Sequence, residues 1–190
     1  MKSDVIVVSA NEDKISDALT LAEKVAAYKE LSPKSALHLR LLTEEVMSMV
    51  HAITGAVEGD FWIENEGNVF KLHLQVRTNI DEEQREKLLS ASKSGKNEAT
   101  KGIMGKIRAF FEPLDGLPVF YGEDMGMLAD AVWSMRAYQE QVRKYIEEKR
   151  DGADEAWDEL EKSVIFHIAD DVKVSIYGRD VELTVIKEMA

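Results

Sequence analysis

The chain has no cysteine. It can therefore form no disulfide bond, bind no metal through a thiolate and use no cysteine nucleophile. Its four histidines, His38, His51, His73 and His167, lack the spacing of a metal site, such as two histidines four residues apart on a helix. We expect them to be ordinary surface or core residues and predict no metal site.

Long apolar runs and an excess of positive charge are also missing. The apolar run at residues 5–8 is far shorter than the roughly 20 residues that a membrane-spanning helix needs. It is also too short for the hydrophobic part of a signal peptide. A formal net charge of −12 repels the phosphate backbone of a nucleic acid. We therefore expect a cytoplasmic protein whose partners are neither membranes nor nucleic acids.

What the sequence does contain is enough apolar residues, 45%, for a globular core. At 190 residues, one domain with an insertion is a better expectation than two small domains. A β-branched run predicts a strand over residues 4–9, and helical spacing predicts a helix from residue 14 to Leu31. Ser32 is expected to cap a second, long helix that begins at Pro33 and ends near Gly55.

The same patterns assign the rest of the chain. Alternating apolar and polar residues predict two β-hairpins, over residues 61–76 and 172–186. Helical spacing predicts further helices over residues 81–92, 100–112, 127–150 and 155–168. The irregular stretch before residue 127 and the helix after it are interpreted together as an insertion, residues 114–150, in a single domain of residues 1–190.

The second helix also carries a local motif. Residues 39–53 read LRLLTEEVMSMVHAI, an apolar helix that bears two adjacent glutamates. This motif and the order of the elements resemble the GHKL superfamily of ATP-binding domains, which includes histidine-kinase catalytic domains, gyrase-type ATPases and bacterial anti-sigma serine kinases. The resemblance covers about residues 1–112 and 155–189. It implies an α+β two-layer sandwich of the Bergerat type, with helices on one face of a mixed, mostly antiparallel sheet.

The resemblance gives roles to two positions on this helix. It implies that Glu45 is the catalytic base that activates water, and that the residue four positions later holds magnesium between the phosphates of ATP. The family has asparagine at that later position, whereas this chain has Met49. A thioether is a poor ligand for a hard cation. Glu45 stands beside Glu44, and a solvated carboxylate is the simpler interpretation of it.

Two further motifs of the family contact the nucleotide. One is Asp-x-Gly-x-Gly after the third strand, which binds adenine; Arg77 and Thr78 stand in its place, and residues 76–81 contain no glycine. The other is a glycine-rich phosphate lid, which residues 95–108 resemble and which assigns Lys101, Gly102 and Gly105 to the phosphates. The resemblance thus implies ATP and Mg²⁺ as the ligands of these positions.

Three hypotheses remain open, and with them the question of whether the chain is an enzyme. The first is a degenerate GHKL-type domain with weak or lost nucleotide binding, acting as a regulatory protein-interaction module whose partner is a sigma factor or an anti-sigma antagonist. The second is an active ATPase or protein serine kinase with Glu45 as base. The third is an unrelated α/β interaction domain. We favour the first, because an active member needs both the asparagine and the aspartate that Met49 and Arg77 replace.

Overall fold

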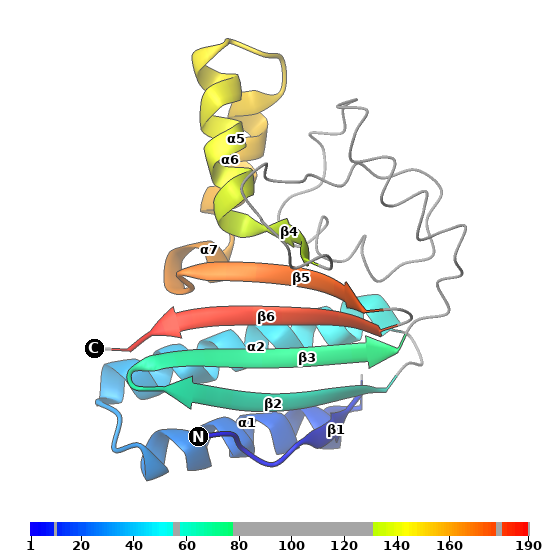
Figure 1. The fold of residues 1–190 in the computed structure, drawn as a ribbon, viewed down its shortest axis with the longest axis vertical. Coiled ribbons are helices and arrows are strands. Elements are labelled where there is room, and N and C mark those ends of the chain that lie inside the picture. The colour runs from blue at the N-terminus through cyan, green and yellow to red at the C-terminus, as the bar shows by residue number, and fades with distance from the viewer. Residues whose placement is uncertain (10, 55–57, 78–130, 178–179, 190) are drawn as a thin grey trace.

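The computed structural model describes residues 1–9, 11–54, 58–77, 131–177 and 180–189. Its described strands form one sheet of six strands in the order β1-β2-β3-β6-β5-β4. The bounds are β1 Ile6–Val8, β2 Gly59–Glu66, β3 Val69–Arg77, β4 Ala131–Ser134, β5 Asp171–Tyr177 and β6 Asp180–Glu188. Every pairing between these strands is antiparallel, and helices lie on one face of the sheet (Figure 1). The α+β sandwich expected from the sequence is confirmed.

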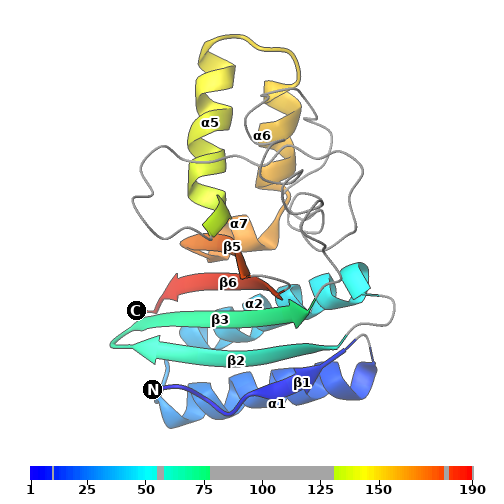
Figure 2. The same ribbon diagram turned by 45° about the vertical axis from the view of Figure 1, so that its right-hand side comes forward.

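The two helices that follow β1 form the second layer. They are α1, Glu12–Tyr28, and α2, Pro33–Thr54, and both run along the same face of the sheet behind β2 and β3 (Figures 1 and 2). The Ser32 hydroxyl accepts a hydrogen bond from the Ser35 N–H at 3.2 Å, which confirms the predicted cap. Helix α2 therefore begins where the cap predicts, whereas α1 begins two residues before the predicted residue 14 and ends at Tyr28 rather than Leu31.

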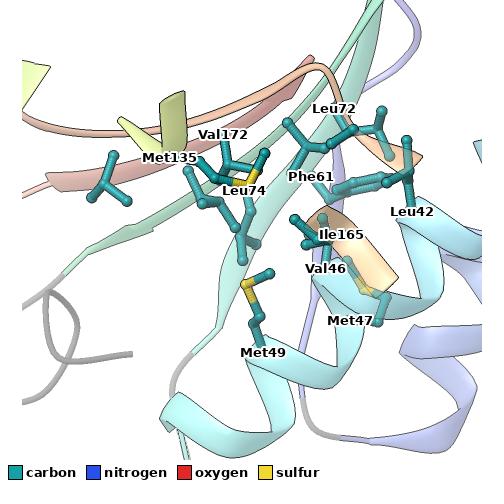
Figure 3. Packing of buried hydrophobic residues seen from close by; sticks show 14 of the residues in the cluster. Leu42, Val46, Met47, Met49, Phe61, Leu72, Leu74, Met135, Ile165 and Val172 are labelled. Carbon is teal, nitrogen blue, oxygen red and sulfur yellow. The ribbon is translucent and has the colours of Figure 1, made fainter. Parts of the chain in front are cut away.

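The core lies between these helices and the sheet. One side of α2 contributes Leu42, Val46 and Met49, which meet inward-facing strand residues such as Phe61 and Leu74 (Figure 3). Alternate residues of each strand point into this layer, so the opposite face of the sheet carries the polar set. The C-terminal strand β6 pairs with β3 and thereby joins the two ends of the chain in one sheet.

The three other described helices lie near the side of the sheet formed by β5 and β4. They are α5, Met135–Glu147, α6, Ala153–Glu161, and α7, Val164–Ile168. Helices α5 and α6 stand side by side and project beyond β4 and β5, while α7 contacts α2 (Figure 2). The projecting helical pair is thus attached to the domain at its β4 and β5 side.

Two predicted helices need correction. Within the helix expected over residues 127–150, Ala131–Ser134 instead form strand β4 and pair with β5. Ser134 then caps α5 by accepting a hydrogen bond from the Ala137 N–H at 3.4 Å. The helix expected over 155–168 is interrupted at Ser163, whose backbone is extended. Pairing and packing with distant residues override helical spacing at both places. The helices predicted over 81–92 and 100–112 lie outside the described residues.

Candidate functional site

The predicted base, Glu45, lies in the middle of α2. Its side chain is half-buried, and burial, together with the neighbouring charge of Glu44, raises the pKa of the Glu45 carboxyl. Glu44 accepts a hydrogen bond from Arg40 Nε at 3.1 Å. The surroundings of the two adjacent glutamates therefore differ: Glu44 is held in an ion pair with Arg40, while the Glu45 carboxyl is half-buried.

Met49 is a core residue. It is only 2% exposed and belongs to the continuous hydrophobic cluster. Figure 3 shows its side chain directed from α2 toward the sheet, on the side of Leu74. The Ser48 hydroxyl next to it donates a hydrogen bond to the Glu45 carbonyl oxygen at 2.9 Å. At position 49, α2 thus presents an apolar side chain to the core and no oxygen ligand for a cation.

Of the remaining predicted positions, the structure describes Arg77, and it does not lie beside Glu45. Arg77 ends β3, and alternation along that strand directs its side chain to the face opposite α2. The Arg77 side chain is 82% exposed, and its Nε lies 3.8 Å from Asp180 Oδ1 on β6. Thr78, Lys101, Gly102 and Gly105 lie outside the described residues.

The face of the sheet opposite α2 carries a polar cluster that the sequence patterns did not predict. Trp62, His73 and Thr184 stand in register on the adjacent strands β2, β3 and β6. The Trp62 and His73 rings stack with their centroids 4.8 Å apart and their planes 1° apart. His73 Nδ1 lies 2.7 Å from Glu182 Oε1, and His73 Nε2 lies 3.8 Å from Glu64 Oε2. An imidazole is therefore held between two carboxylates.

The surroundings of this cluster lower the pKa of both carboxylates, Glu64 and Glu182. The hydrogen bond with His73 lowers the pKa of Glu182, against a smaller opposing effect of burial. Burial alone would raise the pKa of Glu64, but hydrogen bonds from the Trp62 indole and Lys2 outweigh it, and the net pKa is lowered. Both carboxylates thus stay ionised beside His73. No group of three or more metal-ligating side chains occurs among the described residues.

The helical layer carries a separate feature, a groove between α1 and α2. Its volume is about 380 Å³, and most of its lining side chains are alanine or leucine. The lining residues are Glu23, Ala26, Ala27, Glu30, Leu31, Ala36, Leu37 and Arg40. The groove is apolar inside and charged along its rim, a composition that suits an apolar side chain of a partner better than a small charged ligand.

Known proteins give no independent assignment of the chain. No model of a known protein family matches the sequence, and no curated protein matches it either. Within the part of the chain that the structure describes, no helix combines the length and the apolar character needed to cross a membrane. The candidate sites therefore have to be judged from their own chemistry.

Proposed function

We propose that this chain is a degenerate GHKL-type domain that acts as a regulatory protein-interaction module, with nucleotide binding weak or lost. The burial of Met49 carries this proposal. The family places a magnesium ligand at this position, and here the side chain is an apolar thioether 2% exposed in the core. Met49 differs from the family's asparagine in its chemistry. Its side chain is also packed toward the sheet (Figure 3).

The placement of α2 supports the scaffold part of the proposal. The helix with the Glu-Glu motif packs on the same sheet as the β2–β3 hairpin, as the resemblance requires. The apolar groove beside α1 supports the interaction part, because it offers a surface on the helical layer to a protein partner such as a sigma factor or an anti-sigma antagonist. The proposed module works in the cytoplasm.

Calorimetric titration of the whole chain with ATP, with and without Mg²⁺, tests the proposal. We expect no heat of binding at micromolar to low millimolar ATP and no difference on adding Mg²⁺. Magnesium-dependent binding at micromolar ATP would refute the proposal, because it requires a metal site and an adenine site that this sequence replaces. A Met49→Leu variant serves as a control, because it keeps the core volume and should leave the result unchanged.

The half-buried Glu45 favours a second candidate, an active ATPase or protein serine kinase with Glu45 as base. Burial and Glu44 raise the pKa of its carboxyl, and a carboxylate with a raised pKa is a stronger general base. This candidate predicts ATP turnover that Glu45→Gln abolishes and Glu44→Gln only reduces. Equal turnover by the Glu45→Gln variant and the wild-type chain would exclude Glu45 as the base.

A further inference from the structure

The groove between α1 and α2 is lined by residues from the end of the first helix, the turn after it and the beginning of the second helix. On α1, Glu23, Ala26 and Ala27 lie three and four residues apart on one face, and Glu30 follows the end of the helix. Ala26 and Ala27 have short side chains and leave the space of about 380 Å³ open. Ligand pockets usually have volumes of about 300 Å³ or more, so this groove is among the smaller ones. It has room for one or two large side chains but not for a whole helix.

Apolar side chains are exposed beside this groove. Leu37, which lines it, is 53% exposed, and Tyr28, at the end of α1, is 74% exposed. Large apolar residues exposed next to a concave apolar surface are a sign of a protein contact, and helices commonly dock such surfaces through apolar residues spaced three or four apart. The groove can thus hold one apolar side chain of a partner, and the exposed apolar residues beside it can contact others.

The charges of the rim restrict the chemistry of the partner. Arg40 donates to both Glu23 and Glu44, so its positive charge is already shared between two carboxylates. Glu30 adds a further carboxylate, so the charged side chains that line the groove, Glu23, Glu30 and Arg40, carry a net negative charge. The chain as a whole carries −12. Complementarity therefore favours a partner with lysine or arginine beside its apolar residues.

Glu30 adds an observation that is independent of the groove's shape. Helix α1 ends in a Schellman motif, in which the Leu31 N–H donates to the Ala26 carbonyl oxygen at 3.0 Å and the Glu30 N–H to that of Ala27 at 3.1 Å. Glu30 has a φ of 50°, a left-handed conformation that favours glycine. A glutamate at this place is less stable than glycine would be, and it places a carboxylate among the residues that line the groove.

We propose that the α1–α2 groove binds a basic amphipathic helix of a partner protein, with a leucine-like side chain in the groove and lysine or arginine near Glu30. The proposal rests on the proposed interaction function and names the class of partner. Its test is separate from the ATP titration. ATP binding would overturn the proposal of a degenerate domain but not the proposal that the groove binds a peptide. Failure of the peptide test would overturn only the proposal about the groove.

Fluorescence anisotropy with two labelled model peptides of about 15 residues tests it, a length at which helices become stable enough to form. Both carry leucine at helical spacing of three and four; one has lysine at the remaining positions and the other glutamate. We expect the whole chain to bind the lysine peptide and not the glutamate peptide. Leu37→Asn should weaken binding roughly tenfold or more through lost apolar contact, and Glu30→Lys about fivefold or more through charge reversal.

Glu140→Lys, an equal charge change at an exposed position of α5, is the matched control and should leave the affinity within about twofold. Weakening by Glu140→Lys as strong as by Glu30→Lys would overturn the proposal, because binding would then follow net charge alone. Absence of binding to the lysine peptide would overturn it as well. Sedimentation velocity completes the test: self-association that Leu37→Asn abolishes would assign the groove to a second copy of the chain and refute a basic partner.

Discussion

His73 on β3 lies flat against Trp62 on β2 and at the same time places its Nδ1 2.7 Å from Glu182 Oε1 on β6. This histidine is only 8% exposed, although it lies on the polar face of the sheet. The contacts tie three strands together through side chains, in addition to their backbone hydrogen bonds. We therefore expect this cluster to stabilise the centre of the sheet.

Glu182 should make the stability of the chain depend on acid pH. Its pKa in the folded chain is below its ordinary value, mainly because of the hydrogen bond with His73. A group with a lowered folded pKa contributes stability that is complete above the unfolded pKa, near 4.5, and is lost as the pH falls through the folded pKa. We predict that the free energy of unfolding, measured with urea from pH 7 down to pH 3, falls more steeply for the wild-type chain than for Glu182→Gln.

Glu155→Gln is the control for that series. Glu155 is exposed on α6, so its removal should leave the acid slope of the wild-type chain unchanged. If Glu182→Gln and Glu155→Gln showed the same slope, the stabilising contact between Glu182 and His73 would be refuted.

Met49→Asn should strongly destabilise the fold. The change would put an amide into an apolar cluster that offers it no obvious partner, and it would also remove packing volume. We expect a loss of about 2–4 kcal/mol in the free energy of unfolding, and of less than about 1.5 kcal/mol for Met49→Leu. Chemical denaturation measures both. Near-equal values for the two variants would show that the Met49 side chain is not enclosed as described.

Glu30→Gly should stabilise the chain, unlike most glycine substitutions. Release of the left-handed strain gains about 1 kcal/mol, and the greater freedom of glycine in the unfolded chain removes part of it, leaving about 0.5 kcal/mol. Lys149, with a φ of 53° at the end of α5, is the matched position, and Lys149→Gly should have a similar effect. Thermal unfolding of both variants checks this. Destabilisation by Glu30→Gly alone would mean that the Glu30 side chain supports the fold.

Asp171 should be essential for the attachment of α5. Its buried carboxylate accepts hydrogen bonds from the Arg136 N–H at 3.2 Å, the Ser134 hydroxyl at 3.2 Å and the Val172 N–H at 2.9 Å. Asp171→Ala would leave these donors without that acceptor, at a loss of about 1–3 kcal/mol. We expect the amide of Arg136 to lose hydrogen-exchange protection as well. Unchanged protection at Arg136 would contradict the capping role of Asp171.

Some features of the candidate site could be predicted from neighbouring residues in the sequence, and others depend on residues far apart in the chain. The Glu-Glu motif and the apolar character of position 49 are visible in sequence, and the structure places Met49 on the core side of α2. That Arg77 faces away from this helix depends on the pleat of β3 and could not be assigned without the strand's register. The contact of His73 with Glu182 joins residues 109 positions apart, and no local pattern points to it.

The sequence by itself determined the helices α1 and α2, their boundary at Ser32 and the two hairpins, because periodicity, capping and turn preferences act between residues close in the chain. Only the tertiary structure decided that Ala131–Ser134 form a strand, that Glu182 reaches His73 and that α1 and α2 leave a groove between them. Each of these depends on pairing or packing between segments far apart in sequence, where long-range contacts outweigh local preference.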